Sequence, residues 1–179
     1  MSIVQKIIPH YTYDDWLHWE GKWELIEGHP IAMSPTPIPT HQRVAAELRT
    51  EFTLALRKTG CRHCRAYDPL DFKIADDTIL VPDILIISGE VKKKYLDFPP
   101  VLVVEILSPS TVLRDRHTKY QYYQQQSVPY YLIVDAEQKK IEIYALVEGE
   151  YQLQDRVSEY QFNLSSDCSI TPQLDAVFD

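Results

Sequence analysis

Two apolar runs of strand length stand out in the middle of the chain. Residues 81–87 read VPDILII and residues 101–107 read VLVVEIL, and both runs are rich in β-branched side chains. Each run carries one carboxylate, Asp83 near the start of the first and Glu105 near the end of the second. If the runs form an antiparallel hairpin in which Ser88 pairs with Pro100, then Asp83 pairs with Glu105. The pattern therefore predicts two carboxylates on neighbouring strands.

Two carboxylates at this separation repel each other unless a positive charge lies between them. A divalent cation supplies that charge, because hard cations bind carboxylate oxygens. The alternative is that Asp83 merely follows a turn and that Glu105 is a half-buried strand residue. The pattern of the two strands alone leaves both interpretations open.

A polar helix is predicted directly after the second run. Ser108–Thr111 are typical of a loop and a helix start, and residues 112–126 contain no glycine or proline. Asp115, Lys119 and Tyr123 recur at four-residue spacing and share one face of this helix. Lys119 is then a cation near Glu105. The alternatives are an ordinary helical ion pair for Asp115 and Lys119, and simple packing for Tyr123.

The best helical periodicity in the chain runs from Thr40 to about Thr59. Apolar side chains recur there at three- and four-residue spacing, with Thr40 as the expected N-cap and Gly60 as the stop. His41 falls in the first turn of this helix. It is expected either to approach the two carboxylates or to remain an exposed first-turn residue.

The remaining pattern predicts short elements on either side of these. We expect a helix over residues 11–20 capped by Thr12, a hairpin over residues 23–33 with its turn at Gly28-His29, and a strand over residues 67–74. Further strands are expected at residues 130–134, 141–147 and 151–157, and the tail from residue 167 should pack on the sheet. This order fits a mixed sheet with a helix on each face and a parallel crossover after Glu105.

The composition indicates the class of protein and the cellular compartment. With 179 residues, 45% of them hydrophobic and 25% charged, the chain has the size and balance of one globular domain. No apolar run reaches the roughly 20 residues that span a bilayer, and residues 1–6 show no signal-peptide pattern. We therefore expect a cytoplasmic protein without membrane contact. Its three cysteines are expected to be reduced, partly exposed thiols, because this compartment keeps thiols reduced and three cysteines cannot all pair. Cys61 and Cys64 resemble half of a zinc site, but a second ligand pair at suitable spacing is missing.

Net charge bears on possible partners. A formal charge of −8 argues against coating nucleic acid by charge alone, although it does not exclude a nuclease with metal-binding carboxylates. Basic side chains gather in three places, and each group either touches phosphate or forms a solvated face. They are Arg57, Lys58, Arg62 and Arg65; Lys92–Lys94; and Arg114, Arg116 and Lys119.

Pro82-Asp83, followed by Glu105 and a helix with Lys119, resembles the PD-(D/E)XK nuclease superfamily, and more closely its large bacterial branch of restriction-endonuclease-like proteins of unknown function. The similarity covers most of the chain from about residue 11, and residues 99–135 are its specific part. The motifs that carry it are ELIEG (24–28), MSP (33–35), His41, PD (82–83), PPVLVVEILSPST (99–111), DR (115–116), Lys119, Tyr123 and VPYYLIVD (128–135).

This resemblance implies a restriction-endonuclease-like three-layer α/β/α fold with a central mixed β-sheet. The domain would span residues 1–179, with an N-terminal helix and hairpin at about 11–34 and a nuclease-like core at about 40–179. The implied activity is metal-dependent hydrolysis of DNA, with Mg²⁺ or Mn²⁺ held by Asp83 and Glu105, Lys119 as a catalytic residue, and His41 and Asp115 as accessory groups.

One position departs from the superfamily pattern. The usual lysine lies two residues after the glutamate, where this chain has Leu107. Resembling sequences supply the lysine from the following helix, and Lys119 lies in that place. If Lys119 acts only in the transition state, Lys119→Ala should leave folding nearly intact.

Three functions remain in competition on the sequence alone. The first is a DNA endonuclease, acting as a homodimer because duplex cleavage needs two sites or two visits. The second is a catalytically inactive nuclease-like module that binds nucleic acid or a protein partner, as the missing strand lysine and the acidic charge would suggest. The third is a hydrolase of small phosphoesters, which would need a closed pocket.

Overall fold

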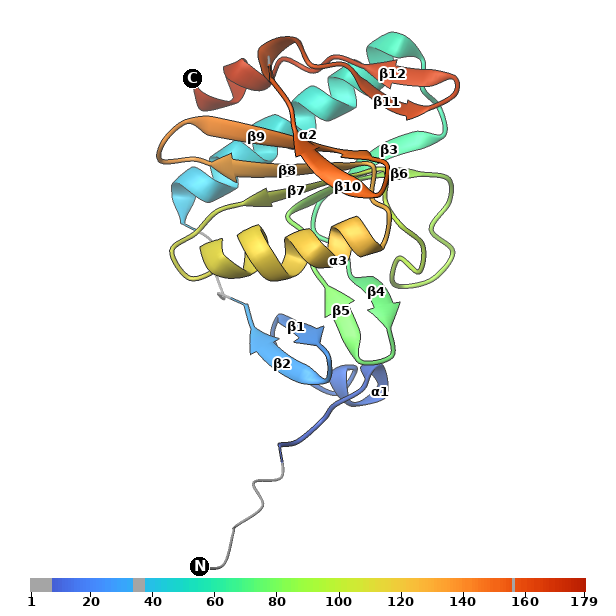
Figure 1. The fold of residues 1–179 in the computed structure, drawn as a ribbon, viewed down its shortest axis with the longest axis vertical. Helices are drawn as coiled ribbons and strands as arrows, with labels where there is room; N and C mark the ends of the chain where they lie inside the picture. Colours follow the sequence, from blue (N-terminus) through green and yellow to red (C-terminus); the bar gives the residue numbers. More distant parts are fainter. Residues whose placement is uncertain (1–7, 34–37, 156) are drawn as a thin grey trace, which may run out of the picture.

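A mixed β-sheet between two helical layers forms the body of the molecule (Figure 1). The computed structural model describes residues 8–33, 38–155 and 157–179. One face of the sheet carries α2 (Pro39–Thr59), and the other carries η1 (Arg114–Lys119) and α3 (Tyr120–Gln125). This is the three-layer arrangement with a central mixed sheet that the sequence predicted.

The central sheet has six strands. In spatial order they are β10 (Glu150–Leu153), β9 (Lys140–Val147), β8 (Tyr130–Asp135), β7 (Leu102–Ile106), β6 (Ile84–Ser88) and β3 (Cys64–Tyr67). Strands β7 and β8 are parallel, and the other neighbours are antiparallel. The helical segment η1–α3 connects the parallel pair, as expected, because parallel neighbours require a crossover.

The β6–β7 hairpin has the predicted register. Ile84 pairs with Val104 and Ile86 pairs with Leu102, so the same register sets Asp83 opposite Glu105. Alternate side chains of β7 enter different halves of the core. Leu102, Val104 and Ile106 pack on the α2 side, whereas Val103 packs on the α3 side. By this alternation Glu105 lies on the face that η1 and α3 cover.

A second, four-stranded sheet lies beside α3. Its strands, in the order β2-β1-β5-β4, are β2 (His29–Ala32), β1 (Trp23–Ile26), β5 (Thr78–Leu80) and β4 (Phe72–Ala75), and the short helix α1 (Tyr13–Trp16) precedes them in the chain. Leu25 of β1 pairs with Ile79 of β5. The N-terminal hairpin is thus hydrogen-bonded to the chain that leads into Asp83.

Several element boundaries differ from the predictions for local reasons. Helix α1 keeps Thr12 as its cap but has only four residues. The turn of the first hairpin is at Glu27 and Gly28, both with positive φ, rather than at Gly28-His29. Helix α2 begins at Pro39 with Ile38 as its N-cap rather than Thr40. A proline at the first helical position accounts for that start, because its fixed φ suits a helix and its missing N–H has no partner there.

The strand predicted over residues 67–74 is two strands in different sheets. Strand β3 ends at Tyr67 in the central sheet, and β4 begins at Phe72 in the second sheet. Pro69 lies between them, where a missing N–H interrupts any continuous ladder. Residues 34–37, which include Pro35, Pro37 and part of the motif at 33–35, lie outside the described residues.

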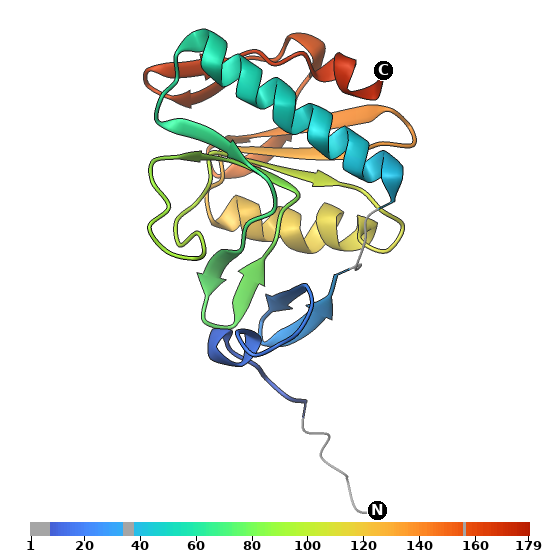
Figure 2. The same ribbon diagram turned by 180° about the vertical axis from the view of Figure 1, so that it is seen from behind.

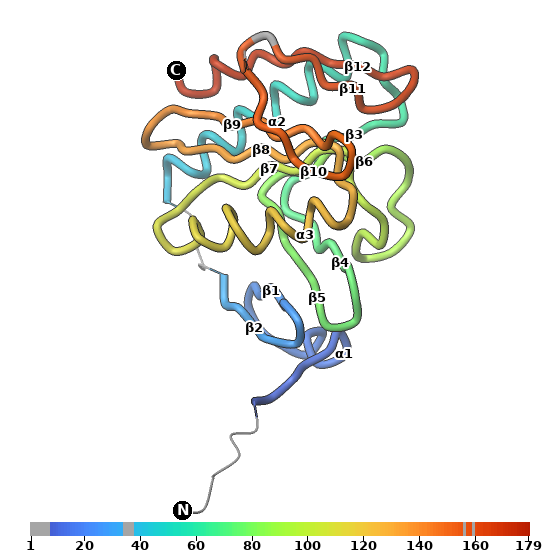
Figure 3. The backbone as a smooth tube through the Cα atoms, viewed as in Figure 1, coloured from blue at the N-terminus to red at the C-terminus, as the bar shows by residue number. Residues whose placement is uncertain are grey.

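The C-terminal segment, which the sequence predicted to pack on the sheet, packs mainly on α2 and shares the core between α2 and the sheet. It contains η2 (Val157–Glu159), β11 (Phe162–Ser165), β12 (Cys168–Ile170) and η3 (Leu174–Phe178). Ile170, Leu174 and Val177 are buried in the same core as α2. Figure 3 traces this return of the chain over the helix. Of the helices in the described residues, none has the length and apolar character needed to cross a bilayer.

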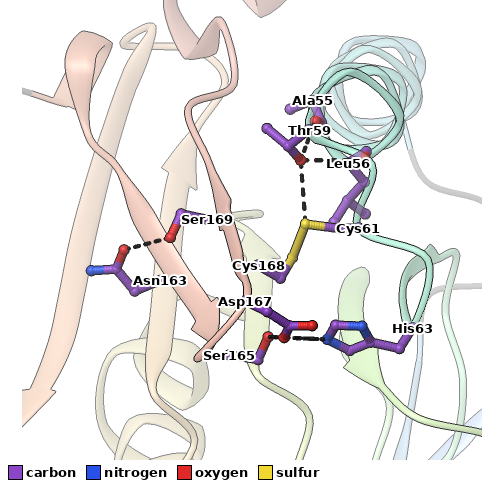
Figure 4. The surroundings of a disulfide bond; sticks show 10 residues. All are labelled: Ala55, Leu56, Thr59, Cys61, His63, Asn163, Ser165, Asp167, Cys168 and Ser169. Atoms are coloured by element: carbon purple, nitrogen blue, oxygen red, sulfur yellow. Dashed lines mark hydrogen bonds and ion pairs between the residues drawn. A yellow bond between two sulfur atoms is a disulfide. The ribbon is translucent and has the colours of Figure 1, made fainter.

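The cysteines correct the expectation of reduced thiols. Cys61, just after α2, forms a disulfide with Cys168 of β12, and their Cα atoms are 5.4 Å apart (Figure 4). Cys64 remains free but is buried rather than partly exposed. The disulfide joins positions 107 residues apart and holds the α2–β3 connection against the C-terminal hairpin.

An ion pair fixes the crossover to the sheet. Arg116 of η1 donates two hydrogen bonds to Glu142 of β9, the shorter at 2.8 Å, so this arginine is engaged inside the protein. Bonds from Arg116, Lys140 and Tyr144 lower the pKa of Glu142 from 4.5 to about 2. Since the folded-state pKa is depressed, the stabilisation is complete above about pH 4.5 and is lost as the pH falls toward 2.

We expect Glu142→Gln to lower the free energy of unfolding at pH 7 by about 1–2 kcal/mol, since the Arg116 side chain is 33% exposed and solvent weakens the pair. The difference from wild type should shrink below pH 4.5 and vanish near pH 2. Urea unfolding at several pH values measures this. Glu137→Gln, an exposed acid on the nearby turn, is the charge-matched control. A difference that does not depend on pH would contradict the assignment.

Candidate active site at the end of the hairpin

All five side chains predicted for the site line one pocket. The pocket has a volume of about 340 Å³ and lies where the open end of the β6–β7 hairpin meets the start of α2 and η1. The five side chains are those of His41, Asp83, Glu105, Asp115 and Lys119. The structure therefore brings together residues that are up to 78 positions apart in the sequence.

Asp83 lies at the bend before β6 and is held from two sides. Its Oδ2 accepts a hydrogen bond of 2.8 Å from the backbone N–H of Ile106 and lies 3.3 Å from Nε2 of His41. The His41 side chain is only 13% exposed, so the interpretation of His41 as an exposed first-turn residue is wrong. The hydrogen bond to Asp83 raises the pKa of His41 despite partial burial.

Glu105 and Lys119 form a buried ion pair. The Nζ of Lys119 lies 2.8 Å from Oε1 of Glu105, and the hydroxyl of Tyr123 donates to the same oxygen at 2.7 Å. Burial alone lowers the pKa of Lys119, but the carboxylates of Glu105, Glu24 and Asp115 outweigh burial and raise it. Lys119 is therefore a charged ammonium ion at neutral pH. Tyr123 packs in the core and also orients Glu105.

Glu24 is the site residue that sequence reasoning missed. It comes from β1, is fully buried, and its Oε1 lies 2.6 Å from Nζ of Lys119. The same oxygen accepts a hydrogen bond of 2.9 Å from the N–H of Val81, and Oε2 lies 3.2 Å from Nε of Arg114. The sequence does contain a signal, because Glu24 is a lone acid within the apolar run WELI (residues 23–26) and is the first residue of the ELIEG motif of the resembling family. The pattern of that run by itself predicts only a hairpin strand.

Asp115 completes the cluster from the crossover helix. Its Oδ1 lies 3.8 Å from Nζ of Lys119 and is buried without a hydrogen-bond partner among the described residues. Burial raises the pKa of this carboxyl group. Both side chains are 2% exposed, so they are not an ordinary surface pair. The segment that carries them is a π-helix, a form that recurs at functional sites.

The cluster contains more negative than positive charge. Four carboxylates, from Glu24, Asp83, Glu105 and Asp115, surround two permanent cations, Lys119 and Arg114. Burial raises the pKa of Glu105, an effect that Lys119 opposes and the neighbouring acids reinforce. Hard oxygen donors with excess negative charge, one of them a buried unpaired oxygen, fit a hard divalent cation. Over the described ranges, however, no three His, Cys, Asp or Glu side chains already converge as a metal-binding group.

Leu107 occupies the strand position of the usual lysine. It packs against the apolar cluster on the α3 side of the sheet, the face on which Glu105 also lies. The burial of Lys119 changes the expectation for Lys119→Ala. Removing an ammonium ion that pairs with two buried carboxylates leaves their charges unbalanced, so the substitution will not leave folding intact.

Comparisons with known proteins agree with this fold. The family model Uma2, described as "Putative restriction endonuclease", matches residues 11–174. A crystal structure of "a putative nuclease belonging to DUF820" from Anabaena variabilis ATCC 29413 superposes with a TM-score of 0.71 at 19% sequence identity. The alignment covers 93% of this chain and 97% of that one, and at this identity it shows the fold alone. No curated protein matches this chain.

Proposed function

Because this chain belongs to the Uma2 family, whose description is "putative restriction endonuclease", we propose that it is a metal-dependent endonuclease that hydrolyses phosphodiester bonds of DNA. One observation carries the proposal. A buried lysine from the crossover helix lies between two carboxylates from different sheets, on the wall of a pocket that also holds Asp83.

The donor set assigns roles to the residues around the pocket. Asp83 and Glu105 would hold Mg²⁺ or Mn²⁺, and the bound ion would polarise a phosphoryl oxygen and lower the pKa of a water molecule. His41 and the N–H of Ile106 fix Asp83, while Tyr123 fixes Glu105. Lys119 offsets the negative charge that grows on the phosphate in the transition state. Glu24 and Asp115 keep that ammonium ion charged and in place.

Plasmid nicking tests this proposal. Purified protein is incubated with supercoiled DNA and either Mg²⁺ or Mn²⁺, with an RNA of equal length as the second substrate. We expect nicking by the wild type and a loss of about 100-fold or more for Asp83→Asn, since the metal contributes several kcal/mol to the transition state. Asp97→Asn, an exposed acid away from the pocket, is the control and should retain activity. Equal rates in both variants would remove Asp83 from the site.

A second candidate is a nuclease-like module that binds without cutting. The observation that favours it is Leu107, an apolar residue at the usual lysine position. DNA binding without nicking in the presence of either metal would support this function.

The assembly and the compartment belong to the same proposal. A homodimer would present two sites to a DNA duplex, and light scattering measures the molecular mass that distinguishes a dimer from a monomer.

A cytoplasmic location suits a DNA substrate, whereas the Cys61–Cys168 disulfide is more typical of an oxidising compartment.

A further inference from the structure

A groove lined by arginines runs beside the edge strand β3. Figure 2 shows how the chain turns from the end of α2 into this strand. Its volume is about 910 Å³, and its walls are the second half of α2, the α2–β3 connection and β3 itself. Arg49 and Arg57 come from α2, Arg62 from the connection and Arg65 from β3. These four are half of the eight arginines in the sequence, so the positive charge is concentrated here.

Most of this charge is unneutralised. Arg57, Arg62 and Arg65 are exposed, and within residues 8–33, 38–155 and 157–179 none of them has an ion-pair or side-chain hydrogen-bond partner. Arg49 lies 3.4 Å from Asp68, the one acid among the lining residues. Four arginines and one aspartate give the groove a net charge of +3 in a chain of net charge −8. Such a local reversal of charge indicates an anionic ligand.

One end of the groove lies beside the candidate active site. Strand β3 is antiparallel to β6, so Tyr67 in the groove pairs with Leu85, two residues after Asp83. Helix α2 starts at the site, where His41 contacts Asp83. Arg49 and Arg57 follow 8 and 16 residues later, about 12 and 24 Å along the helix axis. The groove therefore leads away from the pocket along the sheet edge.

We propose that this groove binds the phosphate backbone of duplex DNA that extends from the cleavage site. The link to cleavage rests on the proposed nuclease function, but binding does not. Guanidinium groups match phosphate in planar, two-bond geometry. The roughly 12 Å between Arg49 and Arg57 spans about three to four phosphates of one strand at about 3.4 Å per base pair. The disulfide at Cys61 fixes the connection that carries Arg62, so the backbone of this arginine is already positioned before DNA binds.

A second copy of this chain is a less favourable ligand than DNA for the free edge of β3. A free edge strand pairs readily with another strand. A symmetric pair of β3 strands, however, would bring Arg65 and Arg62 of two copies together, and like charges that face each other destabilise such pairing.

The test measures binding without cleavage. The probe is a fluorescein-labelled DNA duplex of about 20 base pairs, titrated in EDTA over a salt series and followed by anisotropy. The groove variant carries Arg57→Gln, Arg62→Gln and Arg65→Gln. The control variant carries Lys92→Gln, Lys94→Gln and Lys139→Gln, three exposed lysines outside the groove, and changes the net charge equally. We expect the groove variant to bind about 10- to 100-fold more weakly, with a salt slope smaller by about 2–3.

The outcomes separate this inference from the nuclease proposal. Equal binding by the groove and control variants, or no binding by the wild type, overturns the inference even if the wild type nicks plasmid. Selective loss of binding in the groove variant supports the inference even if no variant ever cuts. Dimerisation that the groove variant alone loses, with DNA binding unchanged, would assign the edge to a second copy and also overturn it.

Discussion

Lys119→Ala is expected to lower the free energy of unfolding by about 3–5 kcal/mol, the range measured when one partner of a buried ion pair is removed. The ammonium ion is 2% exposed and lies 2.6 Å from Glu24 and 2.8 Å from Glu105. Without it, two buried carboxylates must protonate or draw in water. A domain of this size has about 5–15 kcal/mol of stability, so the variant will be folded but fragile. Urea unfolding monitored by circular dichroism measures the loss.

A compensated variant separates the structural role of Lys119 from its catalytic role. Lys119→Met combined with Glu24→Gln removes one charge of each sign, and the amide oxygen introduced at position 24 still accepts from the N–H of Val81. We expect this pair of substitutions to recover only part of the stability, since Glu105 still lacks its cationic partner. Nicking should not return, because no ammonium ion faces the phosphate. Nicking at the wild-type rate by the double variant would show that the reaction does not use Lys119. Wild-type stability in Lys119→Ala would show that the ion pairs are not coupled to folding.

The sequence was sufficient for the parts of the site that depend on local periodicity. Asp83 and Glu105 are equally far from their loop, and strand pairing with a period of two sets them opposite each other. Asp115, Lys119 and Tyr123 recur every four residues, and helical geometry puts them on one buried face. These local rules, together with the order of helices and strands, were enough to predict the layered fold.

The missed features depend on contacts between distant segments. Glu24 meets Lys119 across 95 positions because the N-terminal hairpin joins a second sheet through Leu25 and Ile79, a pairing that no local pattern reveals. The Cys61–Cys168 disulfide spans 107 positions. The sequence already groups Arg57, Arg62 and Arg65 as basic side chains, but Arg49 joins them in one groove only because β3 packs along α2.

Metal binding is expected to raise the melting temperature of the wild type by about 5–10 °C at a Mn²⁺ concentration about 100-fold above Kd. Saturation at that level contributes about 2.7 kcal/mol, and each kcal/mol shifts the midpoint by about 2–4 °C in a chain of this length. The physical source is the excess of carboxylates at the pocket, which a divalent ion neutralises. Differential scanning fluorimetry with and without EDTA measures the shift.

Asp83→Asn should abolish this rise while leaving the metal-free fold in place. An asparagine oxygen still accepts from the N–H of Ile106, so the bend before β6 keeps its hydrogen bond, but the ligand loses its charge. The metal-free variant should melt at or above the wild-type temperature, since the side chain at position 83 no longer repels Glu105. Asp14→Asn, an exposed acid in α1, changes the net charge equally and should keep the full metal response. An equal rise in wild type and Asp83→Asn would place the ion elsewhere, and the nuclease proposal would then lose its metal-binding aspartate.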